Sequence, residues 1–105
     1  MTEKRISLFA EIHLERERQD AKWGEQNHPI KPEKLHNYFK AVAALSRASC
    51  DRAAKDGTIT WYHILREGFF EAMAESTPER QREELIQMIA VGVSMVENID
   101  RNTTL

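Results

Sequence analysis

The sequence has almost no cysteine: Cys50 is the only one among 105 residues. An internal disulfide is therefore excluded, and a chain without disulfides is typical of the reducing cytosol. Cys50 lies among alanine and serine in a segment that is predicted to be helical. We interpret it as a small buried side chain and not as a reactive thiol.

Long hydrophobic runs are missing as well. Residues Met1–Arg5 are followed by no extended apolar stretch, so the sequence shows no signal peptide. No segment approaches the roughly 18–20 consecutive apolar residues of a transmembrane helix. We therefore expect a cytoplasmic protein that does not enter a membrane.

Neither sign of charge dominates, because 15 lysines and arginines face 17 acidic residues and the net charge is −2. Without a basic surplus, dedicated binding of duplex nucleic acid is not expected. No zinc-like His/Cys spacing, glycine-rich phosphate loop or Ser-His-Asp set is present. The length predicts one domain, residues 1–105, and so small a chain often depends on a partner subunit.

Four segments have helical periodicity, so the predicted fold class is all-α, a bundle of four helices. Thr2 is the expected N-cap of the first helix and Gly24 its stop, while Thr60 and Thr77 are the expected N-caps of the last two. Two prolines disfavour helix in the loop at 27–32. The expected helices cover residues 2–23, 32–56, 60–75 and 77–100, and 101–105 form a frayed tail.

The apolar patterns of the second and fourth helices predict how they pack. In the second helix the expected buried stripe consists of Leu35, Tyr38, Phe39, Val42, Leu45 and Ala48. In the fourth, apolar residues between positions 85 and 99 cover more than half of the circumference, whereas a surface helix needs a stripe of only ~100°. This helix is thus either central to the bundle or shared with another subunit. We favour a homo-oligomer with the fourth helix at or near the interface.

Carboxylates gather on the third and fourth helices. Glu67, Glu71 and Glu75 follow one another at i, i+4 spacing. Glu84 falls inside the apolar arc of the fourth helix, where a carboxylate is costly to bury without a partner. Facing carboxylates from two antiparallel helices favour a Mg²⁺ site, because this hard cation takes oxygen ligands and accepts phosphate oxygens. Alternatively, Glu67 and Glu75 are solvated and Glu84 pairs with an arginine.

Two other groups of side chains suit a nucleotide. Trp23, Gln26 and His28 place a flat aromatic face beside amide and imidazole groups, which is what a nucleobase pocket needs. Lys40 and Arg47 lie seven residues apart on one face of the second helix, where they can meet phosphates. The alternatives are a tryptophan that packs on the core at a helix end, and plain solvated cations.

The run Trp61–Ala72 (WYHILREGFFEA), followed by Arg82–Gln87 (REELIQ), resembles the MazG-like all-α nucleoside triphosphate pyrophosphohydrolases. Their signature is E-E-x-x-E on one helix and E-x-x-D on the next. The segment Glu17–His28 is similar to the opening of small bacterial and phage members. The resemblance covers roughly residues 15–100 and implies a MazG-type fold, a nucleotide ligand and a Mg²⁺ cofactor.

The resemblance also implies a ligand set, from which this sequence departs. The family binds its metal through the second and third acids of the first motif and both acids of the second. These positions are Gly68, Glu71, Glu84 and Gln87 here, so two carboxylates are absent. Gln87 offers a neutral carbonyl oxygen, and Glu75 can partly substitute. The implied Mg²⁺ site is weakened, with Glu71 and Glu84 as catalytic residues if hydrolysis is retained.

The leading hypothesis is a nucleotide-binding protein, non-catalytic or weakly catalytic, that senses or sequesters a nucleotide or a nucleotide second messenger. In it Trp23, Gln26 and His28 hold the base, and Lys40 and Arg47 contact the phosphates. The enzyme alternative is a Mg²⁺-dependent nucleoside triphosphate pyrophosphohydrolase. The second alternative is a structural dimerisation module with a vestigial pocket.

Overall fold

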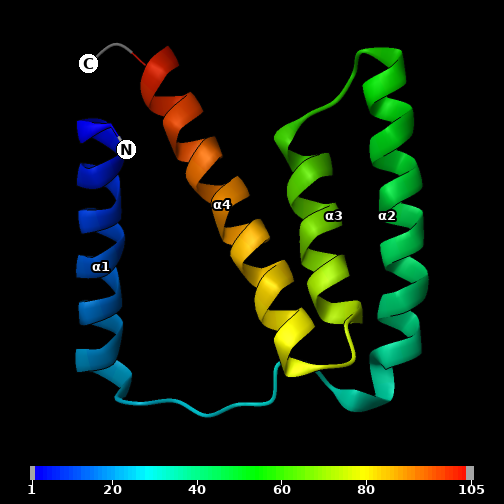
Figure 1. Ribbon diagram of the computed structural model, residues 1–105, viewed down its shortest axis with the longest axis horizontal. Helices are drawn as coiled ribbons and strands as arrows, with labels where there is room; N and C mark the ends of the chain where they lie inside the picture. The colour runs from blue at the N-terminus through cyan, green and yellow to red at the C-terminus, as the bar shows by residue number, and fades with distance from the viewer. Residues whose placement is uncertain (1, 104–105) are drawn as a thin grey trace.

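A computed structural model describes residues 2–103 of the chain (Figure 1). These residues form α1 (Glu3–Trp23), a short 3-10 helix η1 (Glu33–Leu35), α2 (His36–Asp56), α3 (Trp61–Ala74) and α4 (Pro78–Asn102). No strand occurs in this range. The predicted all-α class is therefore confirmed.

The expected capping residues are in place. The hydroxyl of Thr2 accepts a hydrogen bond from the backbone N–H of Arg5 at 3.2 Å, and Thr77 accepts one from Arg80 at 3.3 Å. Gly24 follows α1 with a positive φ of 69°, a conformation that favours glycine. At α3 the backbone N–H of Thr60 donates to Nδ1 of His63 at 3.1 Å, so His63 helps to cap this helix.

Three helix boundaries differ from those expected. After Pro32 the chain first makes the 3-10 turn, and α2 begins at His36. The helix α3 ends at Ala74, with Glu75 already extended. The helix α4 continues to Asn102, whose side-chain amide donates to the carbonyl of Asn98 at 2.8 Å and supports the last turn. Residues 101 and 102 are thus helical, and 104–105 of the expected tail lie outside the described residues.

The packing of α2 departs in part from the predicted stripe of large side chains, of which Phe39 and Val42 are half-buried. Its buried residues are small ones, namely Ala43, Ser46, Cys50 and Ala53. Small side chains allow α3 to lie close against α2, so α3 packs against the side of α2 that carries them. The large Tyr38 and Leu45 are left 55% and 65% exposed.

The prediction that Cys50 is buried is confirmed. The neighbouring carboxylate of Glu67, and secondly burial, raise the pKa of the Cys50 thiol to about 11. The thiol is therefore protonated at neutral pH, and it is a poor nucleophile in that form.

The helices form a layer and not the closed bundle that was expected. α2, α3 and α4 lie side by side in that order, and α1 stands on the other side of α4 (Figure 1). Near the chain ends, Nε of Arg5 on α1 bonds to Oε2 of Glu97 on α4 at 2.9 Å. The Cα atoms extend over 41 × 41 × 22 Å, with a radius of gyration of 16.1 Å. A compact domain of this length has a radius of about 13 Å.

The apolar arc of α4 is largely uncovered within one chain. Val93 is its one buried residue in the described range, while Ile86, Ile89 and Ile99 are 51–60% exposed. The alternative that α4 is central to a bundle within one chain is therefore wrong.

Among the described residues, no helix combines the length and apolarity that a membrane crossing requires.

Candidate functional site

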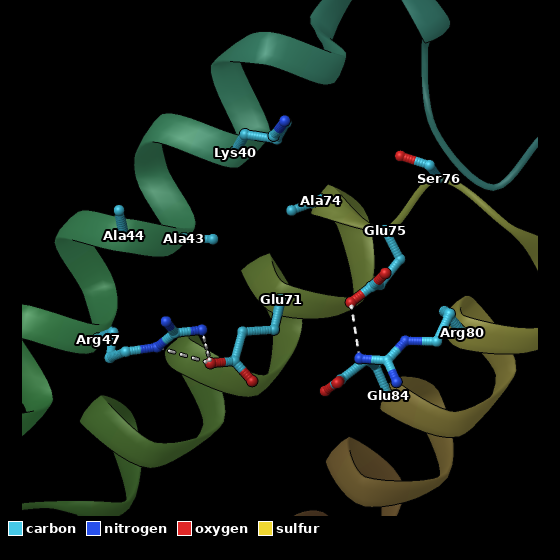
Figure 2. Close-up of a pocket in the computed structure, with 10 residues that line it drawn as sticks. All are labelled: Lys40, Ala43, Ala44, Arg47, Glu71, Ala74, Glu75, Ser76, Arg80 and Glu84. Carbon is cyan, nitrogen blue, oxygen red and sulfur yellow. Dashed lines mark hydrogen bonds and ion pairs between the residues drawn. The ribbon is translucent and has the colours of Figure 1, made fainter.

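A charged cavity of about 450 Å³ lies between α2, α3 and the first turns of α4 (Figure 2). Each helix contributes at least one charged side chain to it, and three alanines also line it. Three cations and three carboxylates line it. Its lining residues are Lys40, Ala43, Ala44, Arg47, Glu71, Ala74, Glu75, Ser76, Arg80 and Glu84. Five site residues expected from the sequence are thus brought together: Lys40, Arg47, Glu71, Glu75 and Glu84.

Two ion pairs cross this cavity. The guanidinium of Arg47 points toward Glu71, and its Nη2 lies 3.0 Å from Oε1 of the carboxylate (Figure 2). Nη2 of Arg80 lies 3.8 Å from Oε1 of Glu75. Both arginine side chains are about 60% exposed, so water screens the pairs and they can rearrange at little cost. Lys40 has no ion-pair partner within residues 2–103.

Glu84 is the carboxylate in the cavity that no arginine pairs with in the described part of the chain. Desolvation raises the pKa of Glu84 above its ordinary value of 4.5, and the negative charges of Glu71 and Glu75 raise it further. The alternative in which Glu84 pairs with an arginine is therefore not observed. Instead, arginines pair with Glu71 and Glu75.

The carboxylates do not form a ready metal site. Across residues 2–103, no group of three or more His, Cys, Asp or Glu side chains is close enough to hold a metal ion. Gln87 is exposed and does not line the cavity. Gly68 contributes no ligand atom, and a Cβ added there would lie 3.6 Å from Cβ of Met88. The described residues thus contain no preformed metal site, and the Mg²⁺ site stays a prediction.

The structure does not bring the predicted base-binding residues to the cavity. Trp23 ends α1, on the far side of α4 from α2 (Figure 1). Its indole is 60% exposed, with Nζ of Lys22 4.9 Å from the ring centroid. Nε2 of Gln26 and Nε2 of His28 lie 3.3 Å apart. None of the three lines the cavity, so the alternative of a tryptophan packed on the core is also not observed.

Lys31 is a buried residue that the sequence analysis missed. It is 5% exposed, and its ammonium group donates to the backbone carbonyls of Met73 and Glu75 at the end of α3. Nδ1 of His36 lies 2.6 Å away. These bonds satisfy carbonyls that the helix end leaves free and fix the backbone at Glu75. The available signal was a lysine between Ile30 and Pro32 in the expected loop.

The chain matches no protein-family model, no curated protein and no solved structure. Membership in the MazG-like family therefore stays a prediction that rests on the quoted motifs.

Proposed function

We propose that this protein binds a nucleotide through its phosphates in the charged cavity, and that it cleaves the nucleotide weakly or not at all. One observation carries the proposal: Lys40, Arg47 and Arg80 converge with three carboxylates on one cavity. The motif resemblance adds to it, because it points independently to a nucleotide and to Glu71 and Glu84.

The cations supply the phosphate contacts. Lys40 has its ammonium group available for a phosphate oxygen, and the guanidinium of Arg47 offers two parallel donors. Because Arg47 is exposed and its one ion-pair partner among residues 2–103 is Glu71, a phosphate can take the place of Glu71 as the partner of this arginine. The ligand then replaces one ion pair by another, and no cation is left unpaired.

The carboxylates limit what the cavity accepts. Three cations and three carboxylates balance, so a bare polyphosphate meets repulsion as well as attraction. Mg²⁺ brought in with the phosphates relieves this repulsion, because it is a hard cation that phosphate and carboxylate oxygens can share. We therefore expect nucleotide binding to be stronger in the presence of Mg²⁺.

A thermal-shift panel tests the proposal. The protein is heated with nucleoside mono-, di- and triphosphates, each with and without Mg²⁺, and with inorganic phosphate as a control. A rise in the melting temperature is expected for at least one nucleotide and is larger with Mg²⁺. No shift with any nucleotide would leave only the structural role.

The second candidate function is Mg²⁺-dependent hydrolysis of a nucleoside triphosphate to the monophosphate and pyrophosphate. The observation in its favour is the raised pKa of Glu84 beside Glu71 and Glu75, since a cation would relieve this repulsion. Pyrophosphate release, measured for the wild type and Glu84→Gln, decides between the candidates. If the wild type releases pyrophosphate and Glu84→Gln does not, the protein is an enzyme and the proposal of binding with little or no cleavage is wrong.

A further inference from the structure

A second cavity adjoins the charged cavity at the turn that joins α3 to α4. It has a volume of about 410 Å³, and residues from η1, the first turn of α2 and the start of α4 line it. Glu75 and Ser76 line both cavities, so the two meet at this turn. A ligand whose phosphates occupy the charged cavity can therefore place its other end in the second cavity.

Lys31 fixes the hydrogen-bonding role of His36 in the second cavity. The ammonium group of Lys31 has three donors and no acceptor, and it donates to the carbonyls of Met73 and Glu75. Its third neighbour is Nδ1 of His36, at 2.6 Å. Because Nδ1 has to accept here, the neutral imidazole carries its proton on Nε2. Nε2 lies 3.5 Å from Oγ of Ser76, a long contact that leaves this N–H available to a ligand.

Glu33 and Gln81 contribute acceptors to the second cavity. Glu33 is exposed and has no ion-pair partner among residues 2–103, so both oxygens of its carboxylate are available. The side-chain N–H of Gln81 donates to the carbonyl of Glu75 at 3.5 Å, which leaves the amide oxygen as an acceptor. The second cavity thus combines a carboxylate and an amide oxygen with the N–H donor of His36.

Guanine is the nucleobase whose edge complements these groups. Its N1–H and its exocyclic amino group are two adjacent donors, and a carboxylate accepts such a pair with both of its oxygens. The second hydrogen of the amino group is left for an amide oxygen, and O6 and N7 accept from an imidazole N–H. In adenine and cytosine a ring nitrogen with a lone pair stands beside the amino group. A carboxylate that approaches this edge gains one hydrogen bond and meets repulsion at the second position.

We propose that the second cavity holds the base of the bound nucleotide and that Glu33 selects guanine. This inference rests on the proposed function, because it takes the phosphates to lie in the charged cavity. Glu33 accepts from N1 and the amino group of the base, and Nε2 of His36 donates to an acceptor of the base. The base contacts then come from the turns around the cavity and not from Trp23, which lines neither cavity.

Calorimetric titration in the presence of Mg²⁺ tests the proposal with four ligands: GTP, ITP, ATP and tripolyphosphate. ITP lacks the exocyclic amino group of GTP, and tripolyphosphate has no base. The wild type is expected to bind GTP on the order of tenfold more tightly than ITP or ATP, as a bidentate base contact does. Glu33→Gln is expected to lose most of this preference. Since Glu33 is exposed, this variant keeps the fold.

Glu79→Gln is the matched control, because Glu79 is an exposed glutamate at the start of α4 that lines neither cavity. It is expected to keep the preference for GTP, and both variants should bind tripolyphosphate equally well. A wild type that does not prefer GTP, or a preference that survives in Glu33→Gln, would overturn this inference and leave the proposed function standing. Absence of binding for every nucleotide would overturn both.

Discussion

Nη2 of Arg47 on α2 lies 3.0 Å from Oε1 of Glu71 on α3, and this ion pair spans the charged cavity. In the proposed site Arg47 contacts phosphate, whereas Glu71 is one of the carboxylates. In the free protein each neutralises the other. A nucleotide that engages Arg47 releases Glu71, so binding of phosphate and binding of a cation become coupled.

The Arg47 side chain is expected to contribute to ligand binding and hardly to folding. It is 61% exposed, and solvent screens its pair with Glu71. Arg47→Ala should therefore shift the melting temperature by no more than about 3 °C, as surface substitutions do. Differential scanning calorimetry measures this shift. A much larger fall would mean that the pair holds α2 to α3.

Glu84 gives the protein a pH dependence that can be measured. Its pKa in the folded state lies above the ordinary 4.5 because of desolvation and the charges of Glu71 and Glu75. Below the unfolded-state pKa the carboxyl is protonated in both states and costs nothing. As the pH rises through the folded-state pKa, ionisation in the cavity removes stability.

Glu84→Gln is therefore expected to be more stable than the wild type at pH 7. The advantage should shrink as the pH falls and vanish below about 4.5, where the wild type is protonated as well. Melting temperatures of both proteins at half-unit steps from pH 4 to pH 7 give the comparison. An advantage that is constant over this range would show that the carboxylate charge is not its cause.

Lys31 is expected to be one of the most sensitive positions in the chain. Lys31→Met keeps the aliphatic stem but removes the donor to the carbonyl of Met73, while the carbonyl of Glu75 keeps one bond, from Gln81 at 3.5 Å. Each buried acceptor that loses its partner costs about 1–3 kcal/mol. Urea denaturation should show this loss. The exposed Lys34 supplies the control, since Lys34→Met should change stability by less than about 0.5 kcal/mol.

Gly68→Glu tests whether a missing carboxylate explains the weak metal site. An added Cβ would lie at ordinary contact distance from Met88, so the helix can accept the side chain. Replacing a mid-helix glycine by Gln gains about 0.5 kcal/mol from helix propensity alone, which makes Gly68→Gln the uncharged control. Mg²⁺ is expected to raise the melting temperature of Gly68→Glu more than that of Gly68→Gln. Equal responses would contradict the ligand position that the resemblance implies.

Much of the fold could be predicted from the sequence, because its determinants are local. Thr2, Thr60 and Thr77 cap helices where the pattern placed them, and Gly24 and Gly57 follow helix ends with positive φ. The face of α2 that packs could not be predicted from hydrophobicity. Because α3 lies close to α2, the side of α2 with small side chains around Ser46 is buried, and the larger Leu45 stays exposed.

The candidate site was predicted in part for a similar reason. Spacing along α2, α3 and α4 places Arg47, Glu71 and Glu84 on sides that meet. The sequence does not show which charges pair, and the contact of Arg80, in the first turn of α4, with Glu75 was not predicted. Trp23 was assigned to the base because an indole stands close to amide and imidazole groups along the chain, but it ends α1, and α1 lies on the far side of α4 (Figure 1).

Calorimetric titration of nucleotide into the protein tests the central claim most directly. The ligand is the nucleotide that gives the largest thermal shift, in the presence of Mg²⁺, and the proteins are the wild type, Arg47→Ala and Arg52→Ala. Arg52 is an exposed arginine of α2 that does not line the cavity. The account predicts one site per chain in the wild type and in Arg52→Ala, and an affinity on the order of tenfold weaker in Arg47→Ala. Equal affinities in all three proteins, or no binding heat in the wild type at millimolar nucleotide, would contradict it.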